Sequence, residues 1–190
     1  MDTDKLIHKY YSDNPQLEAL LLLHSRCVRD KALEVVDKHP ELNADRQFVD
    51  DAAMLHDIGI FRTNAPGIFC YGTEPYICHG LLGAAILRKD GSNSLTGSKV
   101  QEHFERLARV AERHTGTGLT RETIRKQGLP LPDVDFSPVT IEEQIVCYAD
   151  KFYSKSHPER CKTTDQVREM LKKFPDANLE RWDEWVKRFA

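Results

Sequence analysis

The sequence His56-Asp57-Ile58-Gly59 places an imidazole and a carboxylate on adjacent residues. Two such groups within one helical turn can reach the same metal ion, because both are common ligands of divalent metals. The apolar residues that share a helical face with the imidazole are Val49, Ala52 and Ala53. We therefore expect a helix that is capped by residue 43 or 45 and ends at Gly59, with the pair directed into the core.

Other ionisable residues lie on the apolar faces of other expected helices: His24, His79, His114 and Asp150. A single histidine in such a place is more often a hydrogen-bonded core residue than a ligand. The whole set is different, because each buried charge without a partner is costly. We infer a metal centre built from His24, His56, Asp57, His79, His114 and Asp150. Imidazole and carboxylate ligands suit iron, manganese, cobalt, nickel or zinc, and the lack of thiolates argues against a structural zinc site.

Helix signals dominate the rest of the chain. Asn14 and Pro15 are typical of a helix start, and residues 140–143, Thr-Ile-Glu-Glu, form a capping-box sequence. Further helices are expected over residues 15–38, 76–89, 98–114, 120–128, 140–152, 164–174 and 178–189, with loops over 60–75 and 92–98. The sequence thus predicts a single all-α domain, with a core at about 15–155 and a C-terminal helical extension over 156–190.

Composition excludes several classes of protein. The 190 residues are 40% hydrophobic and 30% charged, with a net charge of −3 that favours neither a nucleic-acid nor a membrane partner. No apolar stretch approaches the ~20 residues that span a bilayer. The five cysteines are scattered without a Cys-x-x-Cys motif, which indicates reduced thiols and a cytoplasmic protein.

Near the C-terminus, an apolar stripe is formed by Trp182, Trp185 and Phe189. We expect this stripe to pack back onto the domain, or else to form a homodimer contact.

The order of these residues resembles the HD superfamily of metal-dependent phosphohydrolases: His24, then His56-Asp57-Ile58-Gly59, then Asp150 within residues 148–151, Tyr-Ala-Asp-Lys. The resemblance covers residues 20–155, roughly. Residues 113–116 and 140–151 are similar to a subgroup of small, stand-alone HDIG-type proteins. The resemblance implies an HD-domain helical bundle.

It also implies a division of the ligands. His24, His56, Asp57 and Asp150 match the residues that hold one metal ion in the family. His79 and His114 resemble the extra histidines of binuclear members such as the HD-type diadenosine tetraphosphatases, in which the aspartate of the pair bridges both ions. One or two divalent transition-metal ions are therefore expected.

The implied activity is hydrolysis of a phosphomonoester, phosphodiester or phosphoanhydride bond of a small molecule, a nucleotide above all, by a metal-activated hydroxide. Asp57, Asp150 and Lys151 are the expected catalytic residues, and Arg26, Arg62 and His103 are candidate substrate contacts. His103 is equally consistent with an exposed or capped histidine. Many HDIG proteins have a lysine after the glycine, where this chain has Ile60, so another cation must contact the phosphate.

The loop over 60–75 is either a lid or a cover for the core. Four side chains in or next to this loop are suited to stacking on a base or a sugar: Asn64, Phe69, Tyr71 and Tyr76.

Two other functions stay open on sequence. Some HD-type diiron proteins use a comparable ligand set to activate dioxygen for oxidation at carbon, and redox spectroscopy of the iron-loaded protein separates them from hydrolases. A non-catalytic nucleotide-binding module is the third hypothesis. The complete ligand set argues against it.

Overall fold

Helix caps set the boundaries of the elements that carry the site. The computed structural model describes residues 1–92, 97–174 and 176–190. Helix α2 (Pro15–Lys38) begins where the Asn14 side chain accepts a hydrogen bond from the Leu17 N–H. Helix α7 (Ile141–Asp150) begins with the predicted capping box, in which Thr140 and Glu143 satisfy each other's backbone N–H groups. At the other end of α7, Asp150 is the last helical residue and Lys151 is the C-cap.

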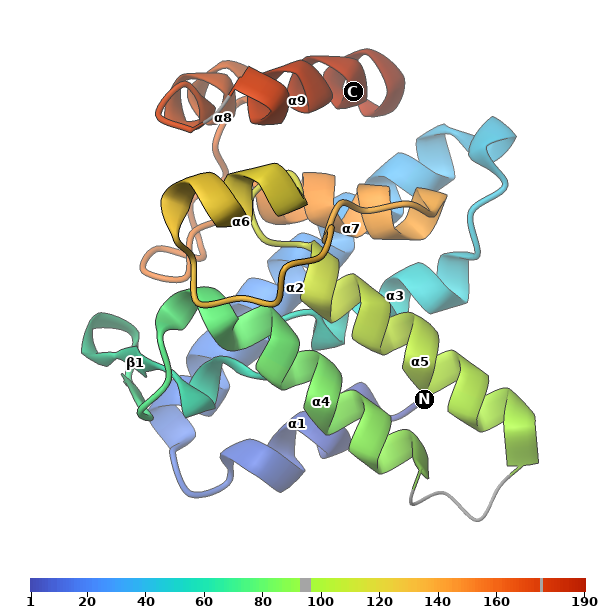
Figure 1. Ribbon diagram of the computed structural model, residues 1–190. Helices are drawn as coiled ribbons and strands as arrows, with labels where there is room; N and C mark the ends of the chain where they lie inside the picture. The colour runs from blue at the N-terminus through green and yellow to red at the C-terminus, as the bar shows by residue number, and fades with distance from the viewer. Residues whose placement is uncertain (93–96, 175) are drawn as a thin grey trace.

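The described elements are mainly helical, which confirms the all-α prediction (Figure 1). The remaining α-helices are α1 (Thr3–Tyr11), α3 (Arg46–Leu55), α4 (His79–Ser92), α5 (Gly97–Arg113), α6 (Arg121–Gln127), α8 (Thr164–Leu171) and α9 (Asp176–Phe189). Short 3-10 helices are η1 (Pro40–Leu42), η2 (Ile60–Arg62), η3 (Pro66–Ile68) and η4 (Tyr76–Cys78). Strands β1 (Asn64–Ala65) and β2 (Cys70–Tyr71) form an antiparallel hairpin in the predicted loop.

The helices pack around one apolar core. Helix α4 lies along α5, and α2 packs against both α3 and α7 (Figure 1). Helices α8 and α9 lie over α7, where Trp182 stacks on Tyr148 with ring centroids 5.0 Å apart. Phe189 also contacts Tyr148, and Trp182, Trp185 and Phe189 are all buried. The prediction that this stripe packs back onto the domain is confirmed.

Several boundaries differ from the sequence prediction. Helix α3 ends at Leu55, so the His-Asp pair lies in the turn after the helix rather than within it. Helix α1 was not predicted, although its buried residues Ile7 and Tyr11 lie one helical turn apart. Helix α4 starts three residues late, since residues 76–78 form the 3-10 turn η4. The predicted loop over 92–98 falls largely on residues 93–96, which lie outside the described residues.

Candidate metal centre

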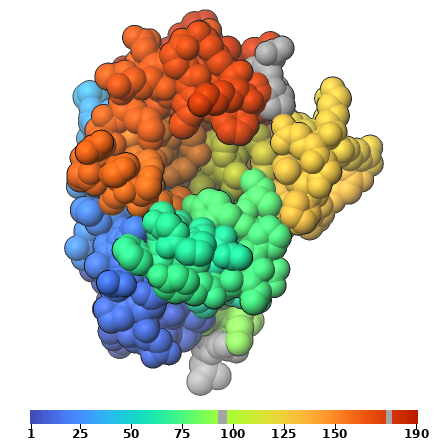
Figure 2. Space-filling model, turned by 90° about the vertical axis from the view of Figure 1, so that its left-hand side faces the viewer, coloured from blue at the N-terminus to red at the C-terminus, as the bar shows by residue number. Residues whose placement is uncertain are grey.

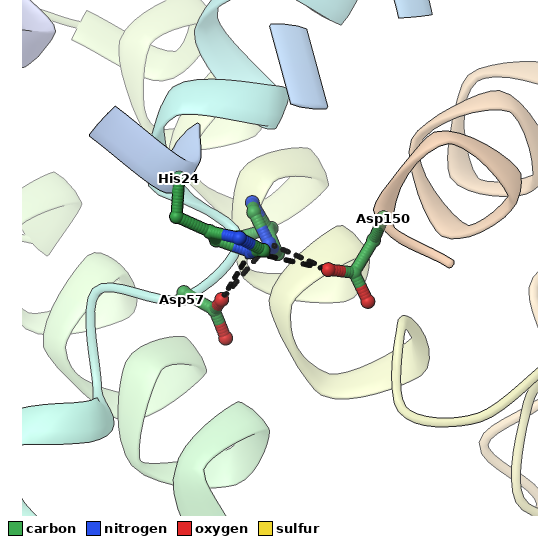
Figure 3. A group of neighbouring side chains, drawn as sticks. His24, Asp57 and Asp150 are labelled. Atoms are coloured by element: carbon green, nitrogen blue, oxygen red, sulfur yellow. Dashed lines mark ion pairs between the residues drawn. The ribbon is translucent and has the colours of Figure 1, made fainter. Parts of the chain in front are cut away.

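The first cluster joins three parts of the chain that are distant in sequence. His24 comes from α2, His56 and Asp57 from the turn after α3, and Asp150 from the end of α7. The Nε2 atom of His24 lies 3.2 Å from Asp57 Oδ2 and 3.2 Å from Asp150 Oδ1. The Nε2 atom of His56 lies 3.0 Å and 3.6 Å from the same two oxygens. Figure 3 shows His24 and the two carboxylates converging, and all four residues are buried.

The second cluster uses the other oxygen of Asp57. Its Oδ1 atom lies 3.4 Å from the Nε2 atom of His79, at the start of α4, and 3.2 Å from that of His114, which directly follows α5. The Oδ2 atom faces His24 and His56, as described above. The two oxygens of one carboxylate are thus divided between two imidazole pairs.

Backbone carbonyls orient the imidazoles. The Nδ1 atoms of His56, His79 and His114 each lie 2.7 Å from the carbonyl oxygen of the residue three positions earlier. A ring that donates from Nδ1 presents the Nε2 lone pair to the cluster. The Nε2 atoms of His79 and His114 are only 3.0 Å apart, and burial lowers the pKa of both rings, that of His79 to about 3. Two neutral rings therefore direct lone pairs at each other, an arrangement that a cation stabilises.

Several polar atoms at the centre have no hydrogen bond. Within the described residues, the Oδ1 atom of Asp57 and the Nε2 atoms of His24 and His56 are buried without a hydrogen-bond partner. Such atoms are rare in folded proteins and require an explanation. Imidazole nitrogens and carboxylate oxygens are the donors that divalent transition metals accept. The residues present thus fit a divalent metal ion in each cluster.

Two glycines allow the helices to approach closely enough to form the second cluster. A Cβ atom on Gly59 would lie 2.3 Å from the carbonyl oxygen of His79 and 2.3 Å from the Gly83 nitrogen. A Cβ atom on Gly80 would lie 2.5 Å from the carbonyl oxygen of Ala111. Because neither position has room for a side chain, α4 lies against both the His-Asp turn and α5. The glycine of the quoted motif therefore helps to bring His79 to Asp57.

Two lysines compensate the buried carboxylates. The Lys155 ammonium lies 2.6 Å from Asp57 Oδ2, and that of Lys151 lies 2.7 Å from Asp150 Oδ2. Burial opposes ionisation of both aspartates, but Lys155 holds the pKa of the Asp57 carboxyl well below its usual range. Lys151 and Lys155 do the same for the pKa of Asp150. Lys151 also donates to the His114 carbonyl at 3.2 Å, which ties Asp150 to the end of α5.

Sequence reasoning missed Lys155. It lies in an irregular turn after α7, where apolar periodicity gives no information about side-chain direction. The signal that was present is the short run of residues 151–155, Lys-Phe-Tyr-Ser-Lys, directly after a predicted ligand.

The three predicted substrate contacts lie elsewhere. Arg26, two residues after His24, points to another side of α2 and pairs with Asp4 at 2.7 Å on the surface. Arg62 is exposed in η2. His103 lies 3.2 Å from Asp51 Oδ2. None of the three lines the cavity beside Asp150, so we do not retain them as substrate contacts.

A cavity of about 590 Å³ opens beside the first cluster. Its floor includes Asp150, Lys151 and Lys155, and the hairpin segment 65–68 and Tyr76 form one wall. Figure 2 shows the hollow between the green hairpin segment and the orange and red C-terminal segments. Of the aromatic residues proposed for the loop, Tyr76 lines the cavity, whereas Tyr71 is 69% exposed and does not.

Comparison with known proteins places this centre in a family. A family model of the HD domain matches residues 21–154, which include all the residues of both clusters. The chain belongs to the HD domain family. HD domains bind divalent metals, in agreement with the buried clusters. The HD domain of the L. monocytogenes phosphodiesterase PgpH, solved in complex with cyclic-di-AMP, has the same fold: the TM-score is 0.51 at 16% identity, over 97% of this chain and 94% of that one.

The curated relatives carry other names. Proteins of Picrophilus torridus and Thermoplasma volcanium named tRNA (cytidine(56)-2'-O)-methyltransferase are each 32% identical, over 94% and 93% of this chain. The HD chain spans only 42% of the length of either relative. An uncharacterised protein of Methanocaldococcus jannaschii is 36% identical over 67% of this chain and 62% of its own length.

Proposed function

We propose that this HD-domain chain is a metal-dependent phosphohydrolase acting on a small phosphorylated molecule, a nucleotide above all. The observation that carries the proposal is the division of Asp57, whose Oδ2 faces His24 and His56 while its Oδ1 faces His79 and His114. His24, His56, Asp57 and Asp150 would hold one ion, and Asp57, His79 and His114 the other.

Divalent ions in such a site supply Lewis-acid stabilisation of phosphate oxygens and lower the pKa of a water molecule. The side chains of the chain provide the geometry. Asp57 fixes the two clusters relative to each other, and Asp150, held by Lys151, completes the first one beside the cavity. An ammonium has three donors, and two of those of Lys151 have partners. Among the described residues the third donor has no acceptor, which leaves it for a phosphate oxygen and supports the predicted role of Lys151 in catalysis.

The cavity supports a small-molecule substrate. Its volume of about 590 Å³ lies within the usual range for ligand sites. Its lining includes Lys151, which contacts Asp150, together with apolar side chains such as Pro66, Ile68 and Tyr76. This arrangement suits a phosphate attached to a flat, weakly polar group, as in a nucleotide. The fold-level likeness to a phosphodiesterase agrees with the same chemistry.

The methyltransferase names of two relatives do not lead us to propose methyl transfer. The chain covers 42% of each relative, and the HD model accounts for most of the matched region. We propose that the shared part is an HD domain and that methyl transfer belongs to the rest of those proteins. The absence of a nucleic-acid partner, the cytoplasmic location and a homodimer remain predictions. No helix in the described ranges is long and apolar enough to cross a membrane.

The test is a phosphate-release screen. Protein loaded separately with manganese, iron, cobalt, nickel or zinc is offered nucleotides and simple phosphoesters. We expect turnover by the wild type, loss of turnover in Asp150→Asn, and full turnover in His103→Ala, which changes a histidine away from the cavity. Absence of turnover with every metal and every substrate would contradict the proposal. Oxygen consumption by the iron-loaded protein would instead support the oxygenase alternative.

A further inference from the structure

Lys162 lines the cavity beside Asp150 but is not paired as its neighbours are. It borders both this cavity and an adjoining one of about 630 Å³. Its backbone N–H donates to the Phe152 carbonyl at 2.9 Å, and the next residue, Thr163, caps α8. These contacts fix the backbone of Lys162 at the border between the two cavities.

The ammonium of Lys162 has no anionic partner. Within the described ranges, no carboxylate or other acceptor lies within hydrogen-bonding distance of it, whereas Lys151 and Lys155 each contact an aspartate. The residue is half-buried, and burial lowers the pKa of its ammonium, an effect that the charge of Asp150 opposes. Because desolvating a cation without a partner is unfavourable, the position favours an anionic ligand.

The charge balance of the site indicates what that anion is. Both buried aspartates already have a lysine partner, so metal ions would give the site an excess of positive charge. A phosphomonoester carries one more negative charge than a phosphodiester when fully ionised. The apolar neighbours Pro66, Ile68 and Met170 line the same cavity and reduce the local dielectric screening. A second negative charge on the phosphate is therefore strongly favoured there.

We propose that Lys162 binds a terminal phosphate oxygen of the substrate and makes the site selective for phosphomonoesters over phosphodiesters. The proposal rests on the proposed function and specifies its substrate class. Because Ile60 follows Gly59, the position directly after the His-Asp motif supplies no cation for this contact. It acts as a substrate-binding residue.

Matched substrates and variants test the proposal. The rates of the manganese-loaded wild type, Lys162→Gln and Lys173→Gln are measured with 4-nitrophenyl phosphate and with bis(4-nitrophenyl) phosphate. Lys173 is an exposed lysine after α8 and controls for the loss of one charge. Loss of a charged hydrogen bond predicts a roughly tenfold or greater fall in kcat/KM for the monoester in Lys162→Gln, mainly through KM. The diester rate should change less than about threefold, and Lys173→Gln should match the wild type.

Binding of orthophosphate gives a readout without turnover. Calorimetric titration of the manganese-loaded proteins should show orthophosphate binding by the wild type and Lys173→Gln, and binding at least about tenfold weaker by Lys162→Gln. Equal binding by all three proteins, or none by the wild type, would overturn the role of Lys162. Hydrolysis with an unchanged monoester-to-diester ratio in Lys162→Gln would overturn it too, while leaving the hydrolase intact. If no ester is hydrolysed, the proposed function fails and the titration alone decides on Lys162.

Discussion

Replacing Lys155 with methionine should destabilise the metal-free protein much more than the metal-loaded protein. The Lys155 ammonium lies 2.6 Å from Asp57 Oδ2, and the two side chains are 13% and 0% exposed. In the described part of the chain, Asp57 Oδ1 has no hydrogen-bond partner and Oδ2 is paired with Lys155, so Lys155 is the main compensation for this charge when no metal is bound. The substitution leaves this buried carboxylate with the imidazoles alone, of which the His56 ring, 3.0 Å away, is the one with a raised pKa.

The size of the effect follows from the burial of the pair. Removing one partner of a buried ion pair costs about 3–5 kcal/mol. For a chain of 190 residues, this corresponds to a fall in Tm of roughly 6–20 °C. A divalent ion at the first cluster restores a cation beside Asp57, so the loss with saturating metal should shrink to about 1 kcal/mol, the typical cost of a point mutation.

The assay is thermal and urea unfolding of the wild type, Lys155→Met and Lys173→Met, each in chelator and in excess manganese. The control variant should match the wild type in both conditions, since Lys173 is exposed. Equal destabilisation of Lys155→Met with and without metal would refute the reasoning, because it would mean that the ion and the ammonium do not compensate the same carboxylate.

Two further predictions concern the ligands. His79→Ala should lower the bound metal from two ions to one per chain, as measured by elemental analysis. His103 pairs with Asp51 away from the cavity, so His103→Ala should leave the metal content unchanged. Two ions in both variants would show that His79 is not a ligand. Metal binding should release a proton near pH 7.5, because burial lowers the pKa of His56 but Asp57 and Asp150 overcome this and raise it to about 9. The raised pKa means that the ring is protonated in the metal-free protein at neutral pH and must lose that proton to bind, so the release should fade as the pH passes about 9. Titration calorimetry in buffers of different ionisation enthalpy measures it, and a constant proton count from pH 7 to pH 10 would contradict the assignment.

Helical periodicity was sufficient to predict that the six candidate ligands share one site. Each of them lies on the buried face of a helix, at the end of a helix, or directly beyond that end. His24 is an example: it lies within α2, where the apolar face determines its direction. Arg26 was proposed for its charge near His24, but residues two positions apart lie on different sides of a helix, and Arg26 pairs with Asp4 on the surface.

Irregular segments could not be predicted in this way. Lys155 and Lys162 lie between α7 and α8, where no repeating pattern fixes the side-chain direction. The end of α3 at Leu55 rather than Gly59 has a similar cause. Gly59 suggested a helix end, but its φ of −90° is not the left-handed conformation of a terminating glycine. Its small size serves the approach of α4, a tertiary contact that local sequence does not reveal.

The central claim is that Asp57 joins two metal-binding clusters, and the most direct test is the metal content of Asp57→Ala. The wild type and the variant are purified in parallel, loaded with manganese, freed of excess metal and analysed by mass spectrometry of the elements, with circular dichroism to confirm folding. We predict two ions per chain in the wild type and essentially none in a folded Asp57→Ala protein, because both clusters lose a ligand. Undiminished metal in the variant would contradict the account.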